Sequence, residues 1–261
     1  MIKTILFDLD DTLLWDKRSV AASLRMTCEY AEAVCGVDAS LLEQSIRSEA
    51  AASYSETSVY EFTQSIGINP FEGLWGVFDD AGEQFQTMKK LMPEYRRTAW
   101  TRALKKSGID DGTLGQKLSE HFPMMRAQNP LVFDETFQVL DQLKDRFQLM
   151  LLTNGSPSLQ QTKLTMTPEI APYFDDIIVS GAFGIGKPDT SIFDFAVAKS
   201  GHLKSEAIMV GDNLMTDILG ANRSGIKSVW LNRDNQTANA SIVPDFEIHG
   251  LDELIPLLEN L

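Results

Sequence analysis

The chain has 261 residues, of which 43% are hydrophobic and 23% charged, a composition typical of soluble globular proteins. Its formal net charge of −14 argues against non-specific binding to nucleic acid or to anionic membrane surfaces, because both require a basic face. The first apolar run is too short for a signal peptide and is broken by Asp8, and no run reaches membrane-spanning length. A cytoplasmic protein is therefore expected.

The two cysteines, Cys28 and Cys35, lie on one apolar stripe of a predicted helix. Two helical turns separate their backbones by about 10 Å, which is farther than a disulfide can span. We expect two buried, free thiols in a reducing compartment.

A buried strand is predicted at residues 2–8, and it ends in a group of acids. The apolar run passes directly into Asp8, Asp10 and Asp11. Apolar runs of this length, bounded by turn residues, are typical of buried strands. Strand structure does not require three carboxylates within four positions, and like charges repel. The arrangement therefore indicates a bound cation, a shared proton or both.

From about Lys17 the hydrophobic period becomes helical and stays so for more than a hundred residues. No strand pattern stands out between Trp15 and Asn129. We expect the long fourth helix to be interrupted at Pro93 and the last one to end near Pro123. The predicted helices cover residues 17–35, 40–54, 58–66, 83–106 and 111–126, with a loop or broken helix over 67–82. We interpret residues 16–128 as an all-helical insert.

After Pro130 strands alternate with helices. The predicted strands cover residues 147–153, 176–180, 207–210, 227–231 and 246–249, and the predicted helices cover 134–146, 158–167, 190–201, 215–224 and 252–258. This alternation predicts an α/β fold with a mainly parallel sheet and helices on both faces. The first strand must join this sheet, so residues 1–15 and 129–261 form the predicted core.

Four groups of polar residues follow strands of the predicted sheet. In chain order these groups are Asp8 with Asp10, then Thr153-Asn154-Gly155, then Lys187, then Asp212 with Asn213 and Asp217. Each group alone has an ordinary explanation as a turn, a solvated lysine or a first-turn acid of a helix. Because the carboxyl ends of parallel strands share one edge, we expect the groups to form one site.

A site of this composition suits phosphoryl transfer. One carboxylate can act as a covalent nucleophile, and a second can hold a proton and act as acid and then as base. Hydroxyl, backbone N–H and ammonium groups match phosphate oxygens. A divalent cation would offset the repulsion between the acids and a phosphate, and oxygen ligands favour Mg²⁺. Zinc is disfavoured because His121, His202 and His249 form no tight cluster with the cysteines in the sequence.

These residues resemble the motifs of the haloacid dehalogenase-like (HAD) hydrolase superfamily. The family pattern Asp-x-Asp-x-Thr, Ser/Thr, Lys and Gly-Asp-x-x-x-x-Asp is matched by Asp8 to Thr12, Thr153, Lys187 and Gly211 to Asp217. The resemblance covers residues 2–15 and about 130–235, and the insert occupies the place of the family's helical, C1-type cap. It implies a Rossmann-like core with an inserted cap.

The resemblance also implies the catalytic roles. Asp8 would be the nucleophile that forms an aspartyl-phosphate, and Asp10 would protonate the leaving oxygen and then activate water. Thr153, the backbone N–H of Asn154 and Lys187 would hold the phosphoryl group.

For the metal, the resemblance implies Mg²⁺ held by the Asp8 carboxylate, the Asp10 backbone carbonyl and Asp212. Asp217 and Asn213 would act in the outer shell. Elsewhere in the motifs, Thr12 would buttress the turn, and Asp11 is left without a chemical role and is expected to point away from the site.

The second acid bears on the type of reaction. Dehalogenase relatives lack an acid at the position of Asp10, since a halide leaves without a proton, so we expect a phosphatase. A lysine supplied by the cap, as in the phosphonatase members of the family, remains an open alternative. A lid of about a hundred residues suits a small metabolite. We expect a monomer or homodimer acting on phosphoserine or a similar small phosphorylated acid. The alternatives are a nucleoside monophosphate phosphatase (5′-nucleotidase) and a non-catalytic module that binds a phosphorylated metabolite.

The insert contains a basic run in an otherwise acidic chain. The run consists of Lys89, Lys90, Arg96, Arg97, Arg102, Lys105 and Lys106. It is either a solvated helix face or, together with Arg126, a source of one cation that reaches a second anionic group of the substrate.

Overall fold

The computed structural model describes residues 1–237 and 241–261, and it divides into two compact units. The core unit consists of residues 1–15, 132–155 and 163–261, and the helical unit consists of residues 16–131 and 156–162. Within the described residues, no helix combines the length and the apolar character that a membrane span requires.

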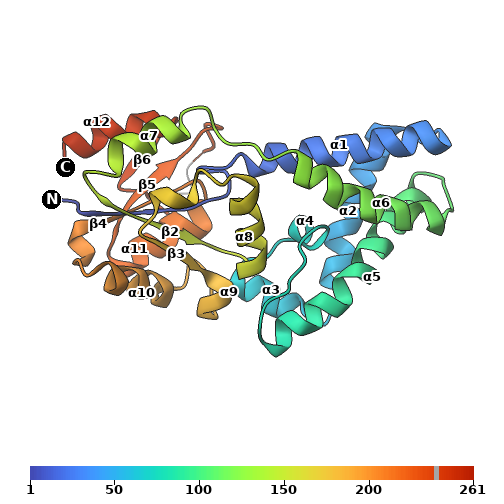
Figure 1. The fold of residues 1–261 in the computed structure, drawn as a ribbon, viewed down its shortest axis with the longest axis horizontal. Coiled ribbons are helices and arrows are strands. Elements are labelled where there is room, and N and C mark those ends of the chain that lie inside the picture. The colour runs from blue at the N-terminus through green and yellow to red at the C-terminus, as the bar shows by residue number, and fades with distance from the viewer. Residues whose placement is uncertain (238–240) are drawn as a thin grey trace. The chain divides into compact units, whose positions relative to one another are not determined.

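The core unit is built on a sheet of six strands in the order β3-β2-β1-β4-β5-β6, and every neighbouring pair is parallel (Figure 1). The strands are β1 Thr4–Phe7, β2 Gln148–Thr153, β3 Asp176–Val179, β4 Ala207–Gly211, β5 Lys227–Leu231 and β6 Phe246–Ile248. The strand order runs outward in both directions from β1 and β4. This reversal of order is where open α/β sheets place their ligands.

Helices cover both faces of the sheet, because successive strand residues point to opposite sides. Ile5 and Phe7 pack in one apolar cluster with residues of α7 (Thr136–Leu143) and α12 (Leu254–Glu259). Leu6 packs in a second cluster with residues of α10 (Thr190–Ser200) and α11 (Leu219–Ser224). The helices of this unit are α7 Thr136–Leu143, α8 Pro157–Met166, α9 Ser180–Phe183, α10 Thr190–Ser200, α11 Leu219–Ser224 and α12 Leu254–Glu259, the first part of α8 being counted with the helical unit. The predicted fold class is confirmed.

The helical unit contains no strand within residues 16–131, all of which the structure describes. Its helices are α1 Asp16–Cys35, α2 Ala39–Ser55, α3 Tyr60–Ile66, α4 Pro70–Gly73, α5 Glu83–Lys106 and α6 Gly112–Gln128. Both cysteines on α1 are free, as expected, although Cys35 is only partly buried.

Two predicted helix breaks were wrong. Helix α5 continues through Pro93, and α6 continues through Pro123 to Gln128. A proline inside a helix removes one backbone hydrogen bond and kinks the helix. Here buried residues lie on both sides of each proline, among them Met92 and Tyr95 around Pro93. Burial of these side chains stabilises the continuous helix, as tertiary packing commonly does.

Candidate active site

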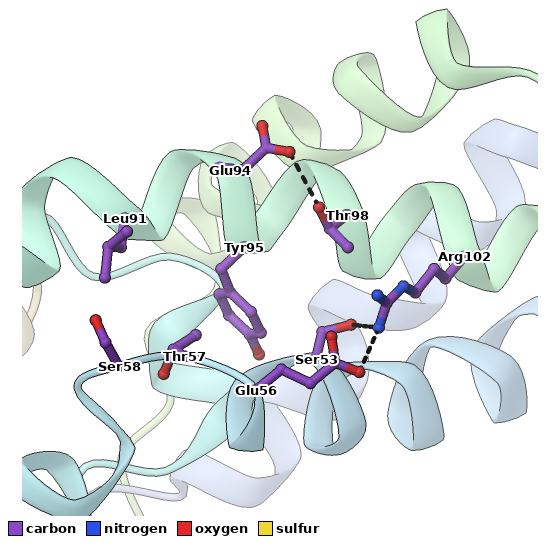
Figure 2. A pocket seen from close by; sticks show the side chains of 9 residues that line it. All are labelled: Ser53, Glu56, Thr57, Ser58, Leu91, Glu94, Tyr95, Thr98 and Arg102. Carbon is purple, nitrogen blue, oxygen red and sulfur yellow. Dashed lines mark hydrogen bonds and ion pairs between the residues drawn. The ribbon is translucent and has the colours of Figure 1, made fainter.

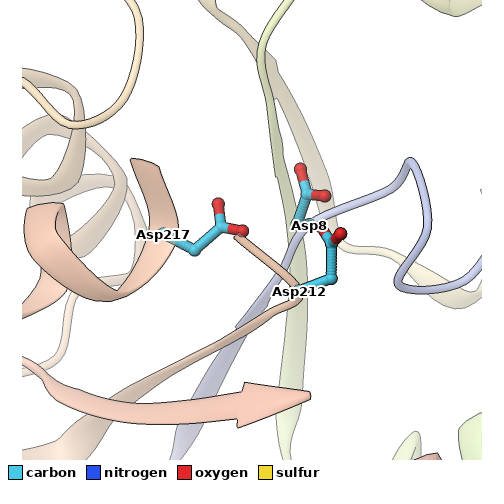
Figure 3. Close-up of side chains that lie close together, drawn as sticks. All are labelled: Asp8, Asp212 and Asp217. Atoms are coloured by element: carbon cyan, nitrogen blue, oxygen red, sulfur yellow. The ribbon is translucent and has the colours of Figure 1, made fainter. Parts of the chain in front are cut away.

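Three carboxylates from separate segments meet at the carboxyl edge of the sheet (Figure 3). Asp8 follows β1, Asp212 follows β4, and Asp217 lies on the π-helical turn Leu214–Ile218. One carboxylate oxygen of each lies within 4.8 Å of the others. These residues therefore meet at the reversal point of the strand order, although about 200 residues separate Asp8 from the other two in sequence.

Asp217 is held in place by the turn that precedes it. The backbone N–H of Asn213 donates to Asp217 Oδ2 at 3.1 Å, while Asn213 Oδ1 accepts from the backbone N–H of Met215 at 2.9 Å. A Cβ at Gly211 would lie only 2.3 Å from Asp217 Oδ2, so the close approach of this carboxylate requires glycine there. Asn213 thus supports Asp217; its outer-shell role toward a metal stays a prediction.

Lys187 connects two of the acids. Its Nζ lies 2.7 Å from Asp8 Oδ1 and 2.7 Å from Asp217 Oδ1, and it donates to the Leu152 carbonyl at 2.7 Å. The lysine side chain is 2% exposed. An ammonium this deeply buried is stable only when charged and polar partners replace its hydration.

The backbone of Lys187 is fixed by the side chain of Asn154. Asn154 Nδ2 donates to the Lys187 carbonyl at 3.0 Å, and Asn154 Oδ1 accepts from the Lys187 N–H at 2.9 Å. Gly186 permits this approach, because a Cβ there would lie 2.6 Å from Asn154 Oδ1. The sequence predicted a phosphate contact for the Asn154 N–H, but it did not predict this positioning role for the side chain.

Burial is the largest single influence on the pKa of Asp8, of Asp217 and of Lys187. Burial raises the pKa of Asp8 to about 7; Lys187 opposes the shift, whereas Asp217 and Asp10 add to it. Burial also raises the pKa of Asp217 against the opposing effect of Lys187. For Lys187, burial disfavours the charged form, but Asp217 and Asp8 outweigh it and raise the lysine pKa. The single positive charge of Lys187 therefore does not offset the burial of both Asp8 and Asp217.

This donor set fits Mg²⁺. Asp8, Asp212 and Asp217 offer hard carboxylate oxygens, the ligands that Mg²⁺ prefers, in a cluster small enough to surround one ion. A bound cation would also offset the excess of buried negative charge. The identity of the metal stays a prediction.

The other predicted site residues occupy the neighbouring strand ends. Thr153 ends β2, is almost fully buried, and its hydroxyl donates to the Asn154 carbonyl at 3.3 Å. The Thr12 hydroxyl is buried without a hydrogen-bond partner among the described residues, so any support it gives the turn comes from packing. Asp11 takes a positive φ of 60°, which aspartate tolerates better than most residues.

Asp10 has a partner that the sequence did not suggest. Lys163 on α8 places its Nζ 2.7 Å from Asp10 Oδ2, and the two side chains are 1% and 24% exposed. The helical period of α8 contained a signal for this partner, because Lys163 falls on the same buried face of the helix as Leu159, Gln160 and Leu164. A charged residue at such a position requires an internal partner.

The basic run of the helical unit is largely engaged in pairs within that unit. Lys89, Arg97, Arg102, Lys105 and Lys106 pair with Asp79, Glu94, Glu56, Asp110 and Glu49. Arg96 donates to the carbonyls of Gly73 and Gly76. Arg126 is buried against Asp16 and Ser19. These pairings favour the interpretation of the run as an ordinary surface network.

A pocket of about 310 Å³ lies within the helical unit, between α2 and α5 (Figure 2). Its lining contains the Arg102–Glu56 ion pair and the Tyr95 ring, whose hydroxyl donates to backbone carbonyls of Pro70 and Ala50. The Thr98 hydroxyl donates to Glu94 at 3.3 Å, but the two carboxylates of the lining, Glu56 and Glu94, are 58% and 62% exposed and already paired with Arg102 and Arg97. We therefore place the candidate active site at the strand ends of the core unit.

Together, the parallel sheet, the acidic cluster at its reversal point and the buried lysine make the carboxyl edge of the core unit the candidate active site of a hydrolase. Comparisons with known proteins agree. The family model described as haloacid dehalogenase-like hydrolase matches residues 2–225. The chain belongs to this family, and the prediction of a HAD-like phosphatase is confirmed.

Similar proteins of nearly the same length carry related names. A phosphoserine phosphatase of Thermus thermophilus is 31% identical over 253 residues, which cover 97% of this chain and 98% of the relative. The HAD-hydrolase YfnB of Bacillus subtilis is 27% identical over 260 residues, covering 98% and 95% of the two chains. The pyrimidine 5′-nucleotidase YjjG of Escherichia coli is 32% identical over 143 residues, or 54% of this chain and 63% of the relative.

Solved structures show the same fold. The crystal structure of YfnB bound to magnesium superimposes with a TM-score of 0.67 at 24% identity and covers 98% of both chains. An L-2-haloacid dehalogenase from Xanthobacter autotrophicus gives a TM-score of 0.64 at 17% identity and full coverage. At these identities the likeness concerns the fold alone.

Proposed function

We propose that the protein is a Mg²⁺-dependent phosphomonoesterase that acts on a small phosphorylated metabolite through an aspartyl-phosphate. The observation that carries the proposal is the pair Asp8 and Asp10, two residues apart at the end of β1, each in contact with its own buried lysine. A nucleophile and a separate proton donor are what the cleavage of an alkyl phosphate requires.

In the first step, an Asp8 oxygen attacks phosphorus and the bond from phosphorus to the leaving oxygen breaks. A proton from the Asp10 carboxyl passes to that oxygen, and the alcohol leaves. Lys187, the Thr153 hydroxyl and the Asn154 N–H would hold the phosphoryl oxygens and stabilise their charge.

In the second step, Asp10 takes a proton from water, and the water oxygen attacks the phosphorus of the aspartyl-phosphate. The acyl phosphate bond breaks, which releases inorganic phosphate and restores the Asp8 carboxylate. Asp8, Asp212 and the Asp10 carbonyl would hold Mg²⁺, with Asp217 and Asn213 supporting them, and the ion would supply positive charge against the phosphate oxygens.

For the substrate, phosphoserine or a similar small phosphorylated acid is the leading candidate. Its support is the phosphoserine phosphatase relative, which matches almost the entire chain. A nucleoside monophosphate is the second candidate, supported by the nucleotidase relatives, which match about half of the chain. The residues that select the substrate belong to the helical unit, which we propose to be the cap.

A panel of phosphorylated metabolites tests the proposal. Wild-type protein with Mg²⁺ should release phosphate from at least one small phosphomonoester, and phosphoserine should give the highest kcat/KM. Asp8→Asn should abolish turnover, since an amide cannot form the acyl phosphate, and EDTA should do the same to the wild type. Phosphate release from no ester, despite binding of a panel member, would identify a non-catalytic binding module instead.

A further inference from the structure

The two carboxylates that follow β1 are held by two different lysines. Lys187, from the loop after α9, contacts Asp8 and Asp217. Lys163, from α8, contacts Asp10 Oδ2 at 2.7 Å. The family pattern that the sequence displays accounts for Lys187 but assigns nothing to Lys163. We propose that Lys163 is a positioning residue, which fixes the orientation of the Asp10 carboxyl for proton transfer to and from the substrate. This inference rests on the proposed function.

The backbone of Lys163 is anchored well enough to act in this way. Its carbonyl accepts from both the backbone N–H and the hydroxyl of Thr167, at 3.2 and 2.9 Å. The next residue, Leu164, is 4% exposed and packs in the apolar cluster with β1 and β2. The ammonium therefore extends from a fixed point of the core unit.

Asp10 lies in a turn that leaves its side chain in need of such a partner. After Leu9 the chain reverses tightly, with the N–H groups of Leu13 and Leu14 both donating to the Leu9 carbonyl. A carboxyl group turns about its own side-chain bonds unless hydrogen bonds select one orientation. The Lys163 ammonium, a donor only, selects the orientation that presents Oδ2 to it. The other oxygen is then the one that exchanges a proton with the substrate.

Burial of Lys163 also argues against a purely incidental contact. The Lys163 side chain is 1% exposed, so its ammonium has given up its hydration for the contact with Asp10 and the neighbouring groups. A lysine needed only for packing at this position would be replaced by a methionine or leucine at no such cost. The ion pair is therefore consistent with a requirement set by Asp10.

Two aryl phosphates can be used as substrates to test whether Lys163 positions Asp10 or only supports the structure. The leaving group of 2,4-dinitrophenyl phosphate departs without a proton, whereas that of phenyl phosphate requires one. The measurement is kcat/KM, because it reports formation of the phosphoenzyme and not its later hydrolysis. Lys163→Met should lower kcat/KM for phenyl phosphate by about 100-fold, within the range of general acid catalysis, and that for the dinitrophenyl ester by less than about 3-fold. Lys163→Arg, which retains a cation, should recover part of the loss.

The matched control is Lys199→Met, on the core helix α10. Lys199 also forms an ion pair, with Nζ 2.6 Å from Asp176 Oδ2, but its side chain is 44% exposed. Both rate constants should stay at the wild-type level in this variant. An equal loss with both esters in Lys163→Met would show a structural role only and would overturn the inference while leaving the phosphatase proposal intact. Wild-type protein that hydrolyses neither these two esters nor any ester of the metabolite panel would instead overturn the phosphatase proposal.

A double variant keeps the test decisive even if Lys163→Met fails to fold with Asp10 left unpaired. Asp10→Asn/Lys163→Met removes both charges, so neither remains buried alone. If Lys163 acts through Asp10, the double variant should match Asp10→Asn within about 2-fold on phenyl phosphate, because the loss caused by Lys163→Met alone disappears once Asp10 can no longer donate a proton. A further tenfold loss would show that Lys163 acts elsewhere and would overturn the inference.

Discussion

The core unit and the helical unit use their charged residues in opposite ways. At the strand ends of the core unit, Lys187 and Lys163 are 2% and 1% exposed, and each contacts a motif carboxylate. In the helical unit, the pairs made by Lys89, Arg97 and Arg102 have side chains that are 43–62% exposed. Exposed pairs contribute little to stability, while a buried pair is costly to break.

We interpret the buried charges of the core unit as parts of the candidate site and the exposed pairs of the helical unit as ordinary surface charges. A buried ammonium beside two carboxylates has no benefit in folding that apolar residues would not match. In a phosphatase it would have a use, because a site rich in carboxylates must attract a phosphate dianion. The pairs of the helical unit need no such explanation. Arg126, buried against Asp16, is the exception within that unit.

The largest effect is expected from Lys187→Met. This change removes the positive charge that faces both Asp8 and Asp217, so the phosphate meets the acids without it. We expect kcat/KM to fall about 1,000-fold, at the upper end for loss of one stabilising donor. Steady-state kinetics with the best ester of the metabolite panel measures it. Retention of more than about a tenth of wild-type activity would contradict the role given to Lys187.

Arg126→Met should have the next largest effect, on stability and not on chemistry. Arg126 contacts Asp16 and Ser19 and lies over the Trp75 ring at 4.8 Å. Its removal leaves the Asp16 side chain, which is 12% exposed, without this partner, and this costs about 3–5 kcal/mol. Urea denaturation followed by circular dichroism measures the loss. Asp16→Asn/Arg126→Met should regain a large part of it, and a single variant as stable as wild type would show that the pair is not essential.

The fold was predictable because its signals are local. Buried strands such as β2 are continuous apolar runs, and the alternation with helices imposes a parallel sheet with β1 inside it. The acids after β1 and β4 were recognisable because carboxylates directly follow apolar strands. The helix breaks at Pro93 and Pro123 were predicted wrongly because the local preference of proline was outweighed by packing across the helical unit.

The supporting side chains were not predictable in the same way. Lys163 lies 153 residues from Asp10, and the pairing depends on where α8 docks on the sheet. The bridge from Asn154 to the backbone of Lys187 likewise depends on two loops meeting across β2 and β3. A motif marks which residues react, but the residues that orient them are specified by tertiary structure.

The pH dependence of Mg²⁺ binding tests whether the core charges are coupled to the ion. Because burial raises the pKa of Asp8 to about 7, the metal-free site holds a proton on this carboxyl below that pH. Mg²⁺ must displace the proton, so its affinity should fall by about tenfold per pH unit below 7 and level off above it. Isothermal titration calorimetry at pH 5.5, 6.5 and 8 measures the trend. Asp8→Asn should bind Mg²⁺ weakly and without this dependence.

The stability of the metal-free protein should also depend on pH through Asp8, but in the opposite direction: it should fall as pH rises, whereas Mg²⁺ affinity rises. An acid whose pKa is higher in the folded state stabilises the fold at low pH, and this contribution is lost as pH rises toward 7. Saturating Mg²⁺ should therefore raise Tm more at pH 8 than at pH 5.5. An equal increase at both values would show that Asp8 does not share its site with the ion.

The smallest effect on stability and activity is expected when an exposed ion pair of the helical unit is removed. Arg97 forms a bidentate i,i+3 ion pair with Glu94 on α5. Its Nε and Nη2 donate to the two carboxylate oxygens at 2.9 and 2.6 Å. The pair lowers the pKa of Glu94 through this hydrogen bonding, yet both side chains remain about half exposed. Water and salt compete for such a pair, so Arg97→Gln should change Tm by less than about 2 °C. The kcat/KM of the variant should equal that of the wild type with every ester of the panel. A selective rise in KM for one doubly anionic ester would instead show that Arg97 leaves Glu94 to bind the substrate's second anionic group, which would make this surface part of the site.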